Sequence, residues 1–245
     1  MLQQKKALIT GGNSGIGYAT AKELAARGAT VMITGRRKEA VEKAAAETGA
    51  LPFVADQASL QDTDRLYRAV EQQLGKLDIL FINAGITGER ALIESVTEED
   101  FDRVMDINFK GAYFTLSKCI PLLNDGASVV ILSSIVAAMH QPLSSVYQAS
   151  KAALNSIAKT AAAELAARKI RVNMISPGPT RTEVLSKSGA DPQTVHNLFN
   201  QLAAAIPLKR TGTPEEVAKL VAYLCDAPAA FITGAEFVMD GGMTL

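Results

Sequence analysis

Short apolar runs alternate with helical patterns along the whole chain, and this alternation constrains the fold more than any other feature. The runs are rich in Val, Ile, Leu and Phe, as is typical of strands buried on both faces of a sheet. Strands that alternate with helices form parallel sheets, because each connection must cross back over the sheet. The sequence therefore predicts one α/β domain over residues 1–245: a doubly wound parallel sheet of about seven strands with helices on both faces. The expected strands are 6–10, 30–34, 51–54, 78–82, 128–132, 171–175 and 236–239, and the expected helices are 15–27, 38–48, 60–74, 97–122, 145–168 and 214–225.

A glycine-rich turn connects the first apolar run to the first helical pattern. Its glycines are Gly11, Gly15 and Gly17, with the spacing Gly-x-x-x-Gly-x-Gly. A strand, a glycine-rich turn and a helix N-terminus together present backbone N–H groups to a pyrophosphate, and the glycines allow its close approach. This spacing is one residue wider than the usual dinucleotide fingerprint. A plain tight turn is the alternative interpretation.

Tyr147 and Lys151 lie four residues apart in a segment with a helical pattern, so they share one helix face. A phenol exchanges protons poorly near neutral pH unless a nearby cation stabilises its ionised form. We therefore expect Lys151 to lower the pKa of Tyr147. The same spacing also occurs by chance on solvated helices.

The composition argues against several kinds of partner. The 25 Lys and Arg residues balance the 25 Asp and Glu residues, which gives no electrostatic reason to expect nucleic acid or an anionic membrane as partner. The first residues lack the apolar run of a signal peptide and no apolar stretch could span a bilayer, so a cytoplasmic location is expected. Cys119 and Cys225 fit no metal or redox spacing and are predicted to pack in the core. His140 and His196 form no metal-binding pattern, so no metal is expected.

Taken together, the motifs resemble those of the short-chain dehydrogenase/reductase family. The resemblance extends from Lys6 to Gly242 and implies a Rossmann-type fold, a nicotinamide cofactor and hydride transfer between that cofactor and a C=O or CH–OH group. The motifs that carry it are Thr10-Gly11 with Gly15 and Gly17, Asn83-Ala84-Gly85, Asn108, Ser134, Tyr147, Lys151 and Pro177-Gly178.

The resemblance also implies roles for four catalytic residues. Ser134 would hold the substrate carbonyl, and Tyr147 would act as general acid or base. Lys151 would lower the tyrosine pKa and bind the nicotinamide ribose. Asn108 is similar to the residue that kinks its helix and positions a water in the proton relay. His140 follows Ser134 closely enough to touch substrate, but we expect no catalytic role for it.

The end of the second expected strand bears on the choice of dinucleotide. Gly35-Arg36-Arg37 stands where an NAD-preferring protein usually places a carboxylate that accepts from the ribose 2′-hydroxyl. Guanidinium groups suit a 2′-phosphate, so NADP(H) is expected in preference to NAD(H), with Arg36 as the main contact. Two observations argue against a preference for NADP(H). Ser14 stands where many NADP-dependent relatives carry a basic residue, and arginines at a helix start are often only solvated.

The complete set of expected cofactor-binding residues follows from the turn, this loop and the resemblance. Asp56 would accept from the adenine amino group, although an Asp before a helix is equally a cap. The set is Gly11, Asn13, Ser14, Gly15, Ile16, Gly17, Arg36, Arg37, Asp56, Gln57, Asn83, Ala84, Gly85, Tyr147, Lys151, Pro177, Gly178, Thr180 and Thr182.

Residues 183–206 contain apolar positions at helical spacing and are expected to form a substrate lid, with a stable surface helix as the alternative.

We predict an NADPH-dependent carbonyl reductase that is reversible as an alcohol dehydrogenase. A 3-oxoacyl-[acyl-carrier-protein] reductase is the alternative; the lack of Lys or Arg over 121–126, often basic in such reductases, speaks against it. A non-catalytic dinucleotide sensor is a third interpretation. From the family, and from apolar positions on both long helices, we expect a homotetramer.

Overall fold

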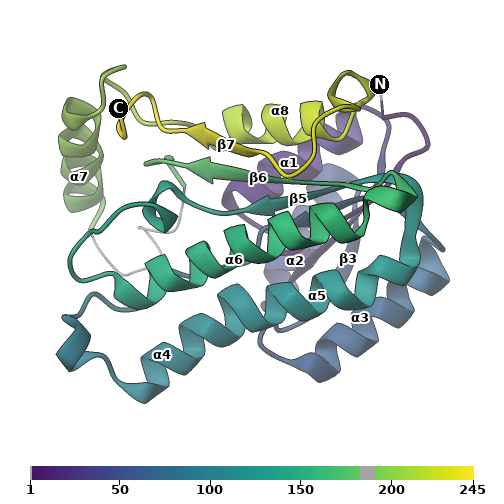
Figure 1. The fold of residues 1–245 in the computed structure, drawn as a ribbon, viewed down its shortest axis with the longest axis horizontal. Helices are drawn as coiled ribbons and strands as arrows, with labels where there is room; N and C mark the ends of the chain where they lie inside the picture. Colours follow the sequence, from purple (N-terminus) through teal and green to yellow (C-terminus); the bar gives the residue numbers. More distant parts are fainter. Residues whose placement is uncertain (1, 183–190) are drawn as a thin grey trace.

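The computed structural model describes residues 2–182 and 191–245 and contains one parallel seven-stranded sheet (Figure 1). The strand order is β3-β2-β1-β4-β5-β6-β7, and every neighbouring pair is parallel. The chain thus runs outward from β1 to β3, crosses to β4, and continues to β7. This reversal leaves a crevice at the carboxyl ends of the strands on either side of the crossover, where doubly wound sheets bind ligands.

The strands and helices follow the alternation expected from the sequence. The strands are β1 Lys6–Ile9, β2 Thr30–Gly35, β3 Leu51–Val54, β4 Leu77–Ile82, β5 Leu123–Leu132, β6 Arg171–Pro177 and β7 Glu236–Met239; the α-helices are α1 Gly15–Ala26, α2 Lys38–Thr48, α3 Leu60–Gln73, α4 Glu98–Met105, α5 Gly111–Cys119, α6 Ser145–Glu164, α7 Pro192–Ala205 and α8 Pro214–Leu224.

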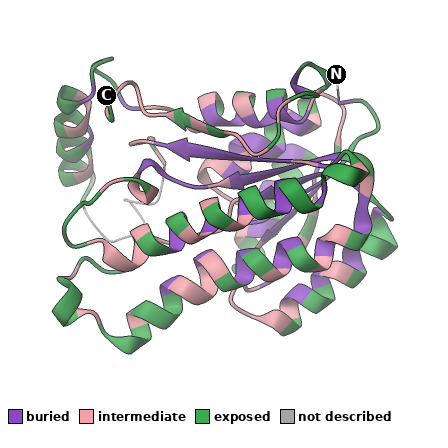
Figure 2. Ribbon diagram, viewed as in Figure 1, coloured by how far each residue is buried: buried purple, intermediate pink, exposed green. Residues whose placement is uncertain are grey.

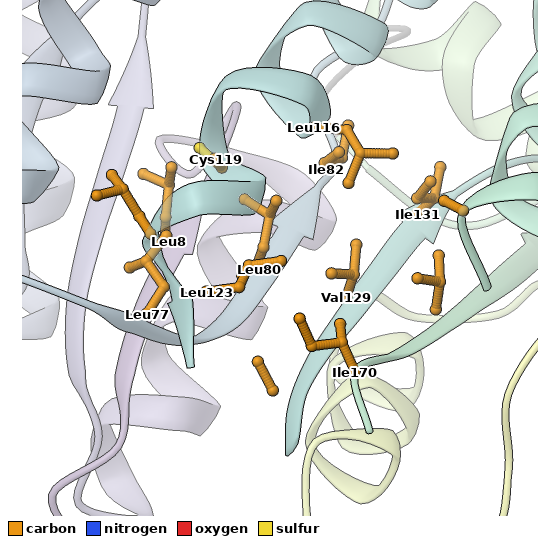
Figure 3. Packing of buried hydrophobic residues seen from close by; sticks show 14 of the residues in the cluster. Leu8, Leu77, Leu80, Ile82, Leu116, Cys119, Leu123, Val129, Ile131 and Ile170 are labelled. Atoms are coloured by element: carbon orange, nitrogen blue, oxygen red, sulfur yellow. The ribbon is translucent and has the colours of Figure 1, made fainter. Parts of the chain in front are cut away.

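Two hydrophobic clusters hold helices against the two faces of the sheet. Alternate residues of β4 separate between them: Leu80 and Ile82 pack with α3, α5 and α6, whereas Ile79 and Phe81 pack with α1, α2 and α8. Figure 2 shows the central strands buried and the outer helix faces exposed. Figure 3 shows the first cluster, in which Leu116 and Cys119 of α5 meet the strand side chains. The doubly wound α/β prediction is confirmed.

Local signals account for several boundaries. The Thr213 side chain accepts a hydrogen bond from the Glu216 backbone N–H, and the Glu216 carboxylate accepts one from the Thr213 N–H. This capping box, with Pro214 at the first helical position, starts α8 where the sequence predicts it. Cys119 and Cys225 are both buried, as expected.

Two boundaries differ from the expectation. The expected helix over 97–122 is interrupted by a π-helical segment, Asp106–Lys110, between α4 and α5. β5 begins at Leu123 rather than at residue 128, because its first residues pair with β4 across an irregularity between Leu77 and Ile79. The apolar positions of 97–122 do not reveal the π-helical segment, and the polar residues Asn124 and Asp125 hide the early start of β5.

Candidate active site

A cavity of about 540 Å³ lies at the carboxyl ends of the strands. It is lined by residues at the ends of β1 to β6 and in the turns that follow them, and by residues at the start of α6. Every residue of the expected set lines it except Gly17 and Asn108. Its lining residues are Gly11, Asn13, Ser14, Gly15, Ile16, Thr34, Gly35, Arg36, Arg37, Ala55, Asp56, Gln57, Asn83, Ala84, Gly85, Ile86, Thr87, Ile107, Leu132, Ser133, Ser134, Tyr147, Lys151, Pro177, Gly178, Thr180 and Thr182.

The floor of the cavity is fixed by contacts between the ends of β1 and β4. The buried Thr10 hydroxyl accepts hydrogen bonds from the backbone N–H groups of Asn83 (3.0 Å) and Ala84 (3.1 Å). In return, the Asn83 side-chain amide donates to the carbonyls of Thr10 (2.9 Å) and Gly11 (3.0 Å). The glycine-rich turn and the Asn83 turn are therefore one rigid unit.

The glycine-rich turn needs its glycines for close packing. Gly11 and Gly15 have positive φ angles of 63° and 53°, which favour glycine. A Cβ on Gly17 would lie 2.2 Å from the Gly11 carbonyl oxygen, so Gly17 brings α1 close to the turn instead of lining the cavity. Ser14 is the N-cap of α1 but makes no side-chain cap bond, and the first turn of the helix carries no acidic residue. The free N–H groups of this helix start therefore face the cavity without a competing carboxylate.

At the other end of the cavity, Ser134, Tyr147 and Lys151 converge from the end of β5 and from α6. Lys151 is 3% exposed, and its ammonium donates to the Leu132 carbonyl (2.9 Å) while lying 5.9 Å from the centre of the Tyr147 ring. The Ser134 hydroxyl accepts a hydrogen bond from the Val136 N–H (3.4 Å) in a short 3₁₀ turn. The helix thus presents the phenol and the ammonium on one face, next to the serine.

The pKa of Tyr147 in the protein alone is raised, not lowered as expected from the neighbouring Lys151. Burial raises the pKa of Tyr147, and a hydrogen bond with Ser134 offsets only part of that rise. Burial also lowers the pKa of Lys151 to about 8. The effect of desolvation on the pKa of Tyr147 outweighs that of the Lys151 charge. The ammonium is 5.9 Å from the centre of the ring, and it donates to a backbone carbonyl, not to the phenol oxygen. Near neutral pH, Tyr147 is therefore a protonated acid.

Asn108 lies in the π-helical segment and is fully buried behind the cavity. Its side-chain amide donates to the Ile86 carbonyl (2.8 Å) and to the Ser150 hydroxyl (3.0 Å), and its oxygen accepts from the Ile86 N–H (2.8 Å). Both amide protons are thus used by the protein, and only an oxygen lone pair is left for a further partner. The expected kink occurs as this π segment, and its clearest effect is to hold the segment after β4 against α6. A role in proton relay stays a prediction.

The opposite end of the cavity is open and basic. Arg36 and Arg37 are exposed, and neither makes an ion pair within the residues that the structure describes. Asp56 accepts from the Ala58 N–H (3.0 Å), whereas the cap of α3 is Ser59. Asp56 therefore shapes a local turn and is not the helix cap. Gln57 donates to Thr115 of α5 (3.0 Å), which attaches this turn to the opposite helix layer.

The segment after β6 forms the remaining wall. The Gly178 N–H donates to the Met239 carbonyl (3.0 Å), and a Cβ on Gly178 would lie 2.8 Å from that of Asp240, so only glycine fits there. Arg181 packs over the Phe199 ring of α7, 5.2 Å from its centre. α7 covers part of the expected lid and stands beyond the carboxyl ends of the strands (Figure 1), whereas residues 183–190 lie outside the described residues.

Several lining residues were not expected from the sequence. Thr34 and Leu132 are the last residues of expected strands, and Gly35, Ala55 and Ser133 directly adjoin expected site positions, so the ends of the predicted strands could have indicated them. Ile86 and Ile107 adjoin the expected Gly85 and Asn108, and Thr87 adjoins no expected position; none of the three ends a predicted strand. His140 does not line this cavity; it is exposed in a second one, on another side of α6, with Met139 and Gln148.

The segment 121–126 does not lie at the cavity entrance of its own chain. It adjoins the start of β5, whereas the cavity lies at the end of this ten-residue strand, about 30 Å away at 3.3 Å per residue. Arg168 is bound there to Asp125 (2.8 Å) and to the Ile120 carbonyl (3.0 Å). The lack of basic residues in this segment therefore does not argue against an acidic carrier at this cavity, which corrects our sequence-based argument.

The fold and the cavity define a dinucleotide-binding oxidoreductase, and the comparisons with known proteins agree. A family model described as Enoyl-(Acyl carrier protein) reductase matches residues 11–244. The chain is 38% identical to the oxidoreductase asL5 of Sarocladium schorii, over 99% of this chain and 96% of that one.

Solved structures give the same result. A 3-ketoacyl-(acyl-carrier-protein) reductase from Brucella melitensis, complexed with NADH, is 34% identical with a TM-score of 0.90, covering 100% of both chains. A blue fluorescent protein from a metagenomic library, in complex with NADPH, is 29% identical with a TM-score of 0.91, covering 100% of this chain and 99% of that one. The protein belongs to the short-chain dehydrogenase/reductase family. No helix among the described residues is long and apolar enough to cross a membrane.

Proposed function

We propose that this oxidoreductase is an NADPH-dependent carbonyl reductase that also acts in reverse as an alcohol dehydrogenase. The observation that carries the proposal is the arrangement of one cavity: buried Ser134 and Lys151 beside the partly buried Tyr147 at one end and two exposed arginines at the other. The first end suits a carbonyl that accepts hydride and a proton, and the second suits an anion.

The residues present fit a nicotinamide dinucleotide. The uncapped start of α1 and the glycine turn suit a pyrophosphate, and Arg36 and Arg37 suit a 2′-phosphate because no carboxylate of the described chain neutralises them. Asn83, Ala84, Gly85 and the Pro177–Thr182 segment would hold the ribose and nicotinamide. When bound, NADPH supplies the hydride, and the protein supplies position and proton control.

In the reduction, the Ser134 hydroxyl donates a hydrogen bond to the substrate carbonyl oxygen, and Tyr147 gives that oxygen its proton. The raised pKa of Tyr147 keeps this acid protonated when the substrate binds. The Lys151 ammonium stabilises the phenolate that remains, because a positive charge held at reduced dielectric acts over several ångströms. In the reverse direction the phenolate accepts the proton, so alcohol oxidation should require higher pH.

A 3-oxoacyl-[acyl-carrier-protein] reductase is the second candidate. The similarity to the Brucella melitensis 3-ketoacyl-(acyl-carrier-protein) reductase, which extends over both whole chains, favours it. A catalytically silent dinucleotide sensor would not need Ser134, Tyr147 and Lys151 to converge on the cavity. A screen of ketones, keto esters, carrier-bound 3-oxoacyl chains and alcohols with NADPH and NADH tests the proposal. Turnover of small ketones with NADPH supports it, and the absence of turnover with every substrate would contradict it.

We also propose a homotetramer. Large apolar side chains are exposed on two separate faces: Leu92, Ile93, Phe101, Tyr113 and Leu143 around α4, α5 and the start of α6, and Leu208, Phe231, Val238 and Leu245 around β7. Exposed large apolar side chains in such numbers suit contacts between copies of a chain. A monomeric mass at micromolar concentration in light scattering would contradict the assembly.

The remaining expectations are a cytoplasmic location, no nucleic-acid or membrane partner, and a substrate-covering role for residues 183–206. Burial raises the pKa of both thiols to about 12, so Cys119 and Cys225 are unreactive packing residues, as a reducing compartment allows.

In α7, Phe199 and Leu198 differ in exposure, at 6% and 37%, so the helix has one packed and one open face. That pattern suits a cover over a partly apolar substrate.

A further inference from the structure

The Asn13 side chain occupies the space in which residue 35 would carry its own side chain. A Cβ built on Gly35 lies 2.3 Å from the Asn13 Oδ1 atom and 3.0 Å from its Cγ atom. Carbon and oxygen atoms do not approach so closely without bonding, so any residue other than glycine at position 35 must displace Asn13.

The backbone around this contact is held in place. The Gly12 N–H donates to the Thr34 carbonyl (2.9 Å), which fixes the glycine-rich turn across the end of β2. The Gly35 carbonyl accepts from the Ala55 N–H (3.1 Å), so Gly35 is tied to the neighbouring β3 end as well. Relief must therefore come from rotation of the Asn13 side chain and not from separation of the two segments.

The second close neighbour is Val41 in the first turn of α2. Its Cγ2 atom lies 2.9 Å from the same Cβ position, and Val41 is fully buried. The Val41 methyl group must also shift, but it lies farther from that Cβ position (2.9 Å) than the Asn13 oxygen does (2.3 Å). Asn13 is the nearer and the more adjustable of the two obstacles.

In doubly wound folds, the residue at the end of the second strand affects which dinucleotide binds. A carboxylate at the end of the second strand accepts hydrogen bonds from the ribose 2′-hydroxyl of NAD, and the same carboxylate repels a 2′-phosphate. Gly35 is the last residue of β2 and lines the cavity next to Arg36. Asn13 therefore stands where that carboxylate would have to be.

We propose that Asn13 and Gly35 form a coupled pair that sets dinucleotide specificity: while Asn13 is present, position 35 must be glycine and cannot carry a carboxylate that binds a ribose 2′-hydroxyl. The inference rests on the proposed use of NADPH. Arg36 and Arg37 attract the phosphate, and Asn13 blocks the alternative.

The test is a double-mutant cycle of wild type, Asn13→Ala, Gly35→Asp and the double variant. The readout is the Kd of each protein for NADPH and for NADH in the absence of substrate, from nicotinamide fluorescence, which is well suited to a chain without Trp. Circular dichroism and thermal unfolding establish that each variant is folded. Val41→Ala/Gly35→Asp is the matched control, because it opens the other side of position 35.

We expect Gly35→Asp to bind both dinucleotides more weakly than wild type. The double variant should bind NADH about tenfold or more tightly than Gly35→Asp and should prefer NADH to NADPH, since a hydrogen bond to a charged group contributes about 1.5–3 kcal/mol. Asn13→Ala alone should still prefer NADPH, because the arginines remain. The Val41 control should not recover NADH binding.

If Gly35→Asp alone reaches the NADH affinity of the double variant, Asn13 does not block and the inference is wrong. The inference is also wrong if the double variant is folded yet gains no NADH affinity. If Gly35→Asp does not fold, Gly35→Ala replaces it with thermal stability as readout. Asn13→Ala should then recover the stability that Gly35→Ala loses, and no recovery would contradict the inference. A wild type that binds NADH as tightly as NADPH would instead overturn the proposed function.

Discussion

The two ends of the cavity are built on different physical principles. At the catalytic end, Asn108, Ser134 and Lys151 are at most 9% exposed and their polar atoms are held by neighbouring groups. At the other end, Arg36 and Arg37 project into solvent. When a buried, hydrogen-bonded group is removed, no water or ion takes its place. An exposed charge is already screened, and water and ions partly replace it when it is removed. Changes at the catalytic end should therefore abolish chemistry, and changes at the other end should alter preference.

The largest expected effect is that of Tyr147→Phe, which removes one hydroxyl from the buried end. Turnover should fall by about 10²-fold or more, because the phenol is the group proposed to give the substrate oxygen its proton. The Kd for NADPH should change little. Steady-state kinetics and a binding titration measure both quantities, with Tyr113→Phe on α5 as the control. Turnover close to wild type would remove Tyr147 from the mechanism.

Burial of Lys151 should be visible in the pH dependence of stability. Its pKa is lowered from 10.5 to about 8, so between these values the unfolded chain binds a proton that the folded chain does not. The free energy of unfolding of wild type relative to Lys151→Met should therefore rise from pH 8 to 10, by up to about 3 kcal/mol, at about 1.4 kcal/mol for each pKa unit. Below pH 8 the folded protein bears the full cost of the buried charge.

Denaturant unfolding at several pH values measures this difference. Both proteins are compared in a Tyr147→Phe background, so that titration of the phenol does not contribute to the difference. Lys159→Met, on the exposed side of the same helix, should show no such trend. A difference between wild type and Lys151→Met that is constant from pH 7 to 10 would mean that Lys151 is not desolvated, and the contrast between the two ends would fail.

A smaller effect is expected at the open end. Arg36→Ala should weaken NADPH binding by about 1.5 kcal/mol, roughly tenfold, which is the lower end for a charge-assisted bond because Arg36 is exposed. NADH binding should hardly change. Lys43→Ala, an exposed cation on the same side of the sheet, controls for nonspecific charge loss. Equal losses for both dinucleotides would show that Arg36 does not contact a 2′-phosphate.

The smallest expected effect is the response to salt with carrier-bound substrate. If no acidic carrier docks, kcat/KM for a small keto ester should be similar to that for a carrier-bound 3-oxoacyl chain, at low and at high salt. Electrostatic steering of a carrier would raise association about tenfold or more and would be screened beyond a Debye length of about 8 Å at physiological ionic strength. A strong preference for the carrier-bound form that disappears with salt would make the carrier reductase the better assignment.

The parts of the structure that follow from local sequence patterns could be predicted. The parts that depend on contacts between residues distant in sequence could not. The strands β1 to β7 follow from apolar runs of suitable length, and the start of α8 follows from Thr213 and Pro214. The π segment around Asn108 has no signal in the apolar periodicity, and only the family resemblance indicated a kink there, because the segment is held by hydrogen bonds to Ile86 and Ser150, which are distant in sequence.

The expected direction of the Tyr147 pKa shift was wrong for the same reason. The spacing of Tyr147 and Lys151 places them on one face, but the direction of the tyrosine pKa depends on burial and on a separation of 5.9 Å. Likewise, the position of Asp125 far from the cavity follows from the length of β5, which begins five residues earlier than its apolar run indicates.

The central claim, hydride transfer from NADPH to a carbonyl with Tyr147 as proton donor, is tested most directly with deuterium-labelled cofactor. NADPH that carries deuterium at the transferred position is incubated with the best ketone of the screen, and the product is analysed by mass spectrometry. The account predicts an alcohol with one deuterium on the carbinol carbon from the wild type, and at least about a hundredfold less from Tyr147→Phe. An unlabelled alcohol, no alcohol at all, or equal labelling by the two proteins would contradict it.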